Sequence, residues 1–351
     1  MINLLQRLSD AISLSGDEGA VRDILRDEVA PHCDDIRVDA LGNLICHKSA
    51  KGDVAPDAWP RKVMVTAHMD EVGLMITHIN EDGSLRFGAV GGIDPRILVA
   101  KRVVIGEKAV PGVIGARPIH LTKAEDRKKV LGMDELTIDI GVKDKDAAAA
   151  LVSPGDYAGF DTRFQILDET GLGTAMGKAF DDRVGCAVLA QLVQGGYPFD
   201  LYAVFTAQEE VGLRGATVAA QAIEPDVGFA LEGTICDDLP KDEDVSPVTV
   251  LGDGPAITLM DHSFIADRRL VNHLVHTAEA RSLPYQFKRA VAGGTDSGAM
   301  HLAGEGVPAV TVAVPARYIH GPVGMISLAD YRATVALMRA ALETLQGGIR
   351  R

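Results

Sequence analysis

Two adjacent carboxylates, Glu209 and Glu210, follow an apolar segment and are the residues best placed for chemistry. The preceding stretch, 201–207, is apolar almost throughout, which is typical of a strand buried on both faces. Neighbouring side chains at a strand end point in different directions, so one carboxylate can bind a metal while the other transfers a proton. Two solvated glutamates at the start of a surface loop would give the same sequence. The other motifs in the chain must therefore show whether this pair belongs to a functional site.

His68 and Asp70 follow another apolar run, 62–67. One residue separates them, so both can lie on the same side of the chain. A carboxylate that accepts a histidine ring N–H fixes the tautomer and leaves the other ring nitrogen for a metal. A polar strand end without a ligand role is the alternative for this motif taken alone.

Asp181 and Asp182 stand at the start of an apolar helix predicted over 182–192. Carboxylates in a first helical turn cap free N–H groups and interact favourably with the helix dipole, so capping alone would explain them. The functional interpretation is that one aspartate bridges two cations while its neighbour turns away and pairs with Arg183.

Two more candidate metal-ligating residues lie at or shortly beyond the ends of predicted strands. Glu232 follows the apolar stretch 227–231, and His320 follows the stretch 308–314. In open α/β sheets, ligands bind at the carboxyl ends of the strands. Two histidines and three carboxylates, one of them shared, can hold two divalent cations close together. The repeated placement predicts a two-metal site formed by His68, Asp181, Glu210, Glu232 and His320.

An α/β unit interrupted by a β-rich insertion must position these residues. Strand and helix patterns occupy 1–70 and return over 165–351, whereas 71–164 consists of short β-prone pieces punctuated by Gly, Pro and Asp. Such spacing predicts a small barrel or sandwich. We therefore expect a discontinuous domain, 1–70 with 165–351, and an inserted β domain, 71–164.

Apolar periodicity and turn residues define the expected elements. Before the insertion, the sequence predicts two helices, the second starting near Glu18, and a hairpin over 37–47. Within it, we expect a charged loop or short helix over 123–133 and strands over 73–77, 85–87, 103–105, 110–114 and 136–140. After it, we expect helices over 182–192, 264–281 and 327–345, and β segments over 201–207, 227–231, 256–260, 285–289 and 308–314.

Composition narrows the class of protein. The 351 residues are 47% hydrophobic and 24% charged, which fits a globular chain with one large domain or two moderate ones. The formal net charge of −14 argues against a nucleic-acid partner, since phosphate contacts require a basic surface. No uncharged apolar stretch approaches the roughly 20 residues of a membrane span, so no membrane partner is expected.

Cysteine usage and the first residues favour a cytoplasmic location. The N-terminal residues lack a basic segment followed by an apolar run and cleavage site. The cysteines show no C-x-x-C spacing, and a chain of this length does not need disulfide bonds to be stable. We therefore expect reduced, buried thiols at Cys33, Cys46, Cys186 and Cys236.

A glycine-rich segment, 293–298, lacks the features of a nucleotide-binding loop. It has neither the Lys-[Ser/Thr] ending of a phosphate-binding loop nor a strand-first G-x-G-x-x-G pattern. Within it, Asp296 is a candidate substrate-binding residue, with a turn aspartate as the alternative. No Gly-x-Ser-x-Gly motif occurs, so the sequence gives no indication of a serine hydrolase.

Five motifs occur in order along nearly the whole chain: His68-Met-Asp-Glu-Val-Gly73, Gly177-Lys-Ala-Phe-Asp-Asp-Arg183, Ala207-Gln-Glu-Glu-Val-Gly212, Gly293-Gly-Thr-Asp296 and Arg317-Tyr-Ile-His-Gly-Pro322. Together they resemble the M42 family of metallo-aminopeptidases, also called tetrahedral or glutamyl aminopeptidases. Two segments of the insertion, 91–96 and 118–120, are also similar to members of that family.

The resemblance implies a mixed-sheet α/β zinc-peptidase domain with two zinc or cobalt ions. In that arrangement Asp181 bridges the ions, His68 and Glu232 complete one site, and Glu210 and His320 complete the other. Glu209 would be the general base and Asp70 the residue that orients His68. The insertion would be a β-barrel dimerisation domain, and dimers would assemble into a tetrahedral dodecamer.

The hypothesis that follows is an aminopeptidase that removes N-terminal residues from peptides. A water bridging the two cations would be the nucleophile, and Glu209 would take its proton. Position 232 departs from the family pattern, because most members have Asp there and this chain has Glu, as in the related M20 carboxypeptidases and deacylases. Two alternatives therefore stay open: an M20-like metal-dependent deacylase of a small N-acyl compound, and a non-catalytic oligomeric scaffold that retains the fold.

Overall fold

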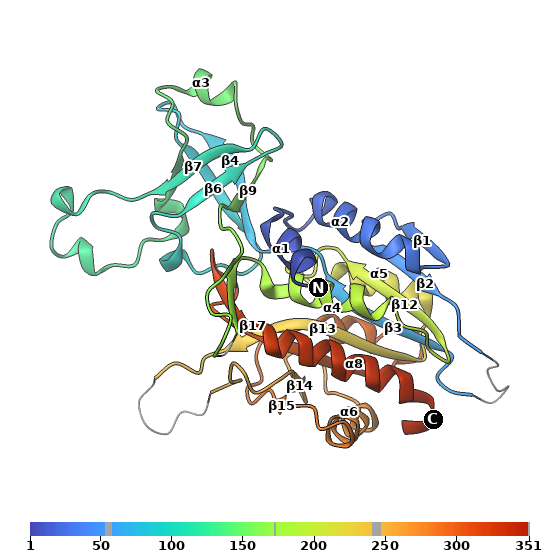
Figure 1. Cartoon of the computed structure of the whole chain (residues 1–351). Helices are drawn as coiled ribbons and strands as arrows, with labels where there is room; N and C mark the ends of the chain where they lie inside the picture. Colours follow the sequence, from blue (N-terminus) through green and yellow to red (C-terminus); the bar gives the residue numbers. More distant parts are fainter. Residues whose placement is uncertain (53–57, 172, 241–246, 350–351) are drawn as a thin grey trace.

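The computed structural model describes residues 1–52, 58–171, 173–240 and 247–349. Figure 1 shows a layered α/β body and a smaller β-barrel that projects from it. The chain forms part of the body, leaves it after β3 to build the barrel, and returns to complete the body. The predicted mixed-sheet α/β fold with an inserted small β-barrel is therefore confirmed.

A mixed sheet forms the centre of the body. Its middle strands are parallel and lie in the order β12 (Asp200–Thr206), β3 (Lys62–His68), β13 (Val227–Cys236) and β16 (Ala309–Arg317). Antiparallel strands extend the sheet beyond β12 with β2 (Leu44–Lys48) and β1 (Asp35–Val38), and beyond β16 with β17 (Gly324–Ser327), β11 (Thr174–Gly177) and β10 (Gln165–Ile166). Two short strands branch from β16: β14 (Ala256–Thr258) and β15 (Gln286–Phe287). The parallel strands thus bring their carboxyl ends to one edge.

Helices cover both faces of this sheet. One face packs against α1 (Ile2–Asp10), α2 (Gly19–Val29), α4 (Phe180–Leu192), α6 (Arg268–Ala280) and α8 (Leu328–Gly348). The other face packs against α5 (Arg214–Ile223) and α7 (Asp296–Met300). In Figure 1, α8 crosses the body in red and α6 lies below it.

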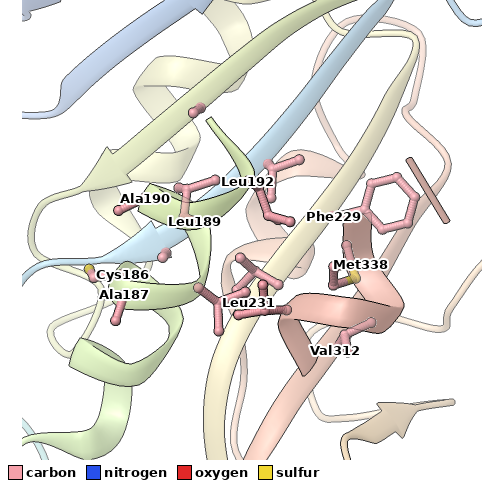
Figure 2. Close-up of a cluster of buried hydrophobic side chains, with 14 of the residues drawn as sticks. Cys186, Ala187, Leu189, Ala190, Leu192, Phe229, Leu231, Val312 and Met338 are labelled. Carbon is pink, nitrogen blue, oxygen red and sulfur yellow. The ribbon is translucent and has the colours of Figure 1, made fainter. Parts of the chain in front are cut away.

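The main core lies between the sheet and α4 and α8. Figure 2 shows Leu189 of α4, Phe229 of β13, Val312 of β16 and Met338 of α8 in one cluster. Along β3, Val63 and Val65 join this cluster, whereas Met64 joins the cluster under α5. Successive residues of a strand point to opposite faces, so a strand covered on both sides is apolar in sequence without alternation. This explains why the apolar runs correctly predicted β3 and β12.

The insertion closes on itself as an antiparallel barrel with its own apolar core. The strand order is β4 (Gly73–Ile79), β5 (Leu85–Val90), β8 (Thr137–Asp139), β7 (Val110–Gly115), β6 (Arg102–Ile105) and β9 (Tyr157–Phe160). The short helix α3 (Lys145–Ala149) lies between β8 and β9. The charged stretch 123–133 is a loop that contains the short 3₁₀ turn η4 (Asp126–Lys128) and leads into η5 (Met133–Glu135). A strand at β9 was not expected from the sequence.

Local capping determines where two helices begin. The Ser327 hydroxyl accepts hydrogen bonds from the N–H groups of Ala329 and Asp330, so α8 starts at Leu328, one residue after the predicted start. The Asp267 carboxylate accepts the N–H of Arg269, so α6 starts at Arg268 and not at the predicted residue 264. The sequence prediction also omitted α5, α7, β10, β11 and β17.

The expectation of four reduced cysteines is wrong for one pair. Cys33 and Cys46 form a disulfide with their Cα atoms 5.8 Å apart, because the hairpin carries β2 back beside the end of α2. Cys186 and Cys236 are free and buried. Among the described helices, none is both long enough and apolar enough to cross a bilayer.

Candidate active site

The carboxyl edge of the parallel strands gathers the predicted site residues. His68 is the last residue of β3 and lies level with Thr206, the last residue of β12. Glu209 and Glu210 follow β12 in a turn, and His320 follows β16 in another. Glu232 does not end its strand as expected, because β13 continues alongside β16 to Cys236.

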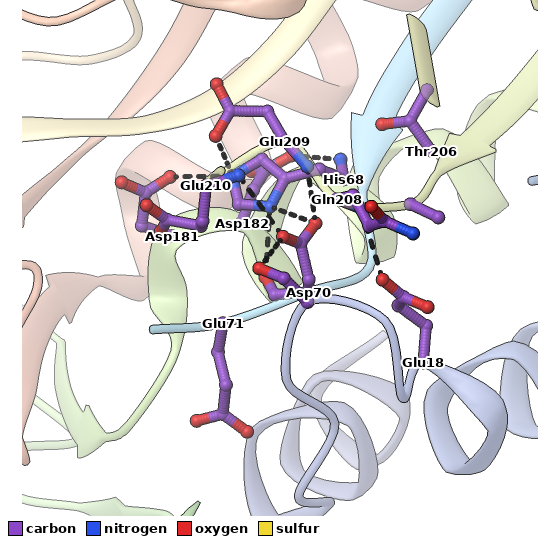
Figure 3. Close-up of polar contacts among 12 residues, drawn as sticks. Glu18, His68, Asp70, Glu71, Asp181, Asp182, Thr206, Gln208, Glu209 and Glu210 are labelled. Atoms are coloured by element: carbon purple, nitrogen blue, oxygen red, sulfur yellow. Dashed lines mark hydrogen bonds and ion pairs between the residues drawn. The ribbon is translucent and has the colours of Figure 1, made fainter. Parts of the chain in front are cut away.

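Asp181 lies between the two histidines. Its Oδ1 is 3.3 Å from His68 Nε2, and its Oδ2 is 3.4 Å from His320 Nε2. Figure 3 shows Asp181 and Glu209 approaching the His68 ring. One carboxylate therefore directs a different oxygen toward each of two nitrogen ligands, which is the arrangement needed to bridge two cations.

The remaining acidic residues divide between the two histidines. Glu232 Oε2 is 3.6 Å and Glu209 Oε2 is 3.8 Å from His68 Nε2. Glu210 Oε2 is 3.5 Å from His320 Nε2. Among the described residues, three groups of ligand atoms are compact enough for a metal ion: Asp181, Glu210 and His320; His68, Asp182 and Glu232; His68, Glu209 and Glu210.

Asp181 and Asp182 differ because the start of α4 is not helical at either residue. Their ψ angles are 105° and 41°, so the two side chains leave the chain in different directions. The Asp182 carboxylate accepts the N–H of His68 at 3.1 Å and the N–H of Gly185 at 2.9 Å. Asp182 thus caps the regular part of α4 and holds the end of β3.

The expected pairing of Arg183 with an aspartate of this turn is wrong. Its guanidinium lies 3.2 Å from Glu71 Oε1 and donates to the carbonyl groups of Leu8 and Ser13. Lys178 also contacts Glu71 Oε1, at 2.6 Å, and burial lowers the pKa of this lysine to about 8. This buried network ties the segment after α1 to the strand ends that carry the site.

Asp70 holds both His68 and the glutamate pair. Its Oδ1 accepts the N–H of Glu209 at 3.1 Å, and its Oδ2 accepts the N–H of Glu210 at 3.2 Å. Its carboxylate lies 3.4 Å from His68 Nδ1, which also hydrogen-bonds with the Asp70 carbonyl oxygen at 3.0 Å. The Nδ1 side of the ring is therefore engaged, and Nε2 faces the carboxylates.

Three residues that the sequence did not single out support the same turn. Glu18 Oε1 accepts the N–H of Gln208, whose φ of 56° is left-handed. Asn43 accepts the N–H of Ala207, and Ser15 donates its hydroxyl to Asp70. The sequence placed Ser15 and Glu18 at the start of a helix and Asn43 in a hairpin turn, with no sign of these contacts.

Burial dominates the electrostatics of the three glutamates at the site, whereas the histidines lower the pKa of Asp181. It raises the pKa of Glu209 and of Glu232 well above the ordinary glutamate value, and the pKa of Glu210 to about 7. Burial opposes the charged form of His68 and His320, but the carboxylates outweigh it and raise the pKa of His320 to about 9. Divalent cations at Asp181 would relieve the repulsion among these carboxylates, so the residues fit a metal centre.

The site opens into a cavity of about 670 Å³. Beyond the histidines and carboxylates, its wall includes Ile235, Thr258, Lys288 and Thr311. Burial lowers the pKa of Lys288. Asp296 does not line the cavity: its N–H donates to Glu232 Oε1 at 3.3 Å and its side chain is buried against Thr206. Asp296 thus contacts Glu232 through its backbone N–H and holds that carboxylate in place.

Comparisons with known proteins identify the family. The model of the M42 glutamyl aminopeptidase family matches residues 42–337. FrvX of Escherichia coli strain K12 is 38% identical, with 98% of this chain and 95% of FrvX aligned. The lysyl aminopeptidase of Pyrococcus furiosus is 33% identical over 98% of this chain and 97% of its own length, and the glutamyl aminopeptidase of Lactococcus lactis is 31% identical over 98% and 96%.

Solved structures agree with this assignment. The TET aminopeptidase of a marine sediment thaumarchaeon superposes with a TM-score of 0.90 at 33% identity, covering 98% of this chain and 97% of that one. The TET1 peptidase of Pyrococcus horikoshii, described as assembling into a tetrahedron or an octahedral shell, gives 0.84 at 34% identity, covering 97% and 98%. The chain therefore belongs to the M42 family of metallopeptidases, as its motifs predicted.

Proposed function

We propose that this chain is an aminopeptidase that uses two divalent cations, zinc or cobalt, to remove N-terminal residues from peptides. The position of Asp181 carries the proposal, because its two oxygens face two different histidines. His68 and Glu232 would complete one metal site, and Glu210 and His320 the other. Lewis acidity and a lowered pKa of water are what such cations supply when bound.

Glu209 is the proposed general base. Its Oε2 is 3.8 Å from His68 Nε2, it faces the cavity, and it is not needed in either proposed set of metal ligands. A carboxylate with a raised pKa can take the proton of the attacking water and return it to the leaving amine nitrogen. Asp70 fixes the backbone of this residue and the ring of His68, so it acts as a positioning residue.

Matched Glu→Gln changes at the two neighbours test these roles. Glu209→Gln should keep the metal content and reduce kcat by about 10²–10⁴-fold, since general-base catalysis contributes that much. Glu210→Gln should lower the metal affinity as well, because it removes a proposed ligand. Metal analysis and turnover of an amino-acyl p-nitroanilide measure both effects. Near-normal turnover of Glu209→Gln with full metal occupancy would refute the assignment.

Glu232 favours a second candidate, a metal-dependent deacylase of a small N-acyl compound. One carboxylate oxygen faces His68, while the other accepts the N–H of Asp296, so the longer side chain directs a single oxygen to the site. An aminopeptidase requires a free α-amine on its substrate. Cleavage of N-acyl amino acids in preference to amino-acyl chromogens would replace the first proposal with this one. A protein that binds no transition metal yet forms a stable oligomer would support the scaffold alternative.

We also propose self-association through the inserted barrel, from dimers to a tetrahedral dodecamer. The TET1 peptidase of Pyrococcus horikoshii supports this by its described assembly. The exposed Val113 on β7 supports the barrel as the contact surface. Sedimentation of wild type and Val113→Asp tests the idea, and an unchanged assembly would count against this surface. The cytoplasmic location stays a prediction, and the Cys33–Cys46 disulfide speaks against it because disulfides are rare in reducing compartments.

A further inference from the structure

His320 is the most exposed of the five proposed metal ligands. Its side chain is 38% exposed, whereas none of the other four exceeds 13%. It stands in a turn after β16, where its own φ of 56° is left-handed. The ring of His68, by contrast, is buried and held by Asp70. The orientation of the His320 ring therefore depends on contacts from outside β16.

The inserted barrel supplies a contact that orients this ring. His320 Nδ1 lies 3.0 Å from the carbonyl oxygen of Gly92, in the loop that follows β5. A carbonyl oxygen only accepts hydrogen bonds, so Nδ1 must carry the proton and donate it. In the neutral ring the lone pair is then on Nε2, which faces Asp181 at 3.4 Å and Glu210 at 3.5 Å. The Gly92 carbonyl thus sets the orientation and the tautomer that a metal ligand needs.

Gly91 allows the loop to come this close to the site. Its φ of 79° is left-handed, a conformation that favours glycine. A Cβ atom at this position would lie 2.8 Å from Val72 Cγ1 and 3.3 Å from Glu210 Cβ. A side chain here would therefore push the loop, with the Gly92 carbonyl, away from His320. On its other side the loop is anchored to the barrel, because Ile93 packs against the barrel core.

Two further contacts from the insertion hold the same turn. Thr162, which follows β9, donates its hydroxyl to the carbonyl oxygen of Pro322 at 2.7 Å. Ile97, in the loop after β5, lies against Gly321, where an added Cβ would be 3.4 Å from Ile97 Cδ1. Three consecutive residues of the turn, 320–322, therefore contact the inserted domain.

We propose that the inserted barrel is part of the metal centre, with Gly92 as the positioning residue that holds His320 for one of the two cations. The proposal rests on the two-metal site proposed above and concerns the cation of Asp181, Glu210 and His320. The His68 ring is held within the body by Asp70 and does not touch this loop. A change in the loop should therefore weaken the binding of one cation and leave the other in place.

Gly91→Ala tests the loop without replacing any proposed ligand. Cobalt titration followed by visible absorption, combined with competition against a chelating dye, measures the two binding constants. Gly91→Ala should weaken one of them about 10- to 100-fold, as loss of an outer partner of a metal-bound histidine does, and leave the other unchanged. Wild-type affinity for both ions would overturn the proposal.

Gly141→Ala is the matched control. Gly141 also belongs to the insertion and has a left-handed φ of 78°, so alanine causes similar backbone strain there. A Cβ atom at this position would meet no atom of the described residues within 4 Å. Both cobalt affinities should stay at their wild-type values. An equal loss in the two variants would show a general effect of a destabilised barrel and overturn the role of Gly92.

Thr162→Val provides a second variant if Gly91→Ala does not fold. Valine has nearly the same shape as threonine but cannot donate a hydrogen bond to the Pro322 carbonyl. The affinity for the same cation should fall about 2- to 10-fold, the range expected from one neutral hydrogen bond. Unchanged affinity in this variant would contradict the idea that the insertion holds the turn.

A double-mutant cycle with His320→Ala separates the ring from Glu210, whose Cβ also lies near position 91. When the ring is absent, Gly91→Ala should cause no further loss of cobalt affinity. A further loss of the same size would show that the loop acts through Glu210, and it would overturn the role of the Gly92 carbonyl. Wild type that binds fewer than two cobalt ions would refute the proposed metal centre itself. Binding of two ions with the same affinities in wild type and Gly91→Ala would refute the role of the loop alone.

Discussion

Replacing Asp70 by asparagine should disrupt the turn that carries the glutamate pair. Asparagine has the same shape, but only one of its terminal atoms accepts a hydrogen bond. The N–H groups of Glu209 and Glu210 donate to different oxygens of Asp70, at 3.1 and 3.2 Å. Whichever way the new amide turns, its NH₂ group faces one of these buried donors. The substitution therefore removes a charge-assisted hydrogen bond and leaves an N–H without a partner.

The size of the effect follows from these two losses. A hydrogen bond to a charged group contributes about 1.5–3 kcal/mol, and an unsatisfied buried donor costs about 1–3 kcal/mol. Together they predict a loss of about 2.5–6 kcal/mol, which corresponds to a fall of about 5–12 °C in the thermal midpoint of a large domain, at about 2 °C per kcal/mol. Because Asp70 also contacts the His68 ring, we expect metal affinity to fall about 10- to 100-fold.

Glu18→Gln is the matched control for this experiment. A single oxygen of Glu18, Oε1, accepts the N–H groups of both Gly16 and Gln208. Glutamine keeps one such oxygen, so the change should cost about 1 kcal/mol or less. Differential scanning calorimetry measures the midpoints, and competition with a chelating dye measures zinc affinity. This account of the turn would be refuted if Asp70→Asn kept the wild-type thermal midpoint and zinc affinity. It would also be refuted if both variants lost the same amount.

Three further results follow from the core and the site. Chelation should lower the thermal midpoint and abolish turnover, and zinc, cobalt or manganese should restore both; a midpoint unchanged by chelation would contradict the metal centre. Phe229→Ala should cost about 3–5 kcal/mol in the unfolding free energy measured by denaturant titration, because the side chain is fully buried; a change below about 1 kcal/mol would show that the core collapses around the gap. Burial lowers the pKa of His273, whose Nε2 hydrogen-bonds to the Ala341 carbonyl, so the unfolded chain, with a histidine pKa near 6.5, takes up the proton first. The stability from His273 is therefore complete above about pH 6.5 and is lost below it, and the midpoint difference between wild type and His273→Gln should shrink from pH 7.5 to 5.5; a constant difference would exclude this titration.

The strand ends were predictable because a strand buried on both faces is a continuous apolar run in the sequence. Apolar runs located β3 and β12, and parallel strands share one carboxyl edge, so His68 and the glutamate pair had to meet. The helix α5 escaped prediction although its small apolar residues recur at helical spacing, at 216, 219, 220 and 223. Alanine-rich helices bury little area per residue, so their periodic signal is weak.

Contacts between distant segments could not be predicted from one sequence. Glu18 and Asn43 reach the turn after β12 from positions 190 and 164 residues away in the chain. Arg183 pairs with Glu71 and not with its neighbour Asp182, because the carboxylate of Asp182 already accepts two backbone N–H groups. Lys288 follows a strand that is too short for its pattern to indicate a pocket wall. Each of these partners is defined by the folded chain and has no local signature.

The different directions of the Glu209 and Glu210 side chains, on which their proposed roles depend, arise from a turn and not from strand alternation. β12 ends at Thr206, so the pair lies beyond the pleat that would place neighbours on opposite faces. Left-handed backbone at Gln208 redirects the chain, and Asp70 then fixes both following N–H groups. This geometry sends Glu210 toward His320 and Glu209 toward His68. The proposed division into metal ligand and base therefore depends on Asp70, which makes that residue the most informative one to change first.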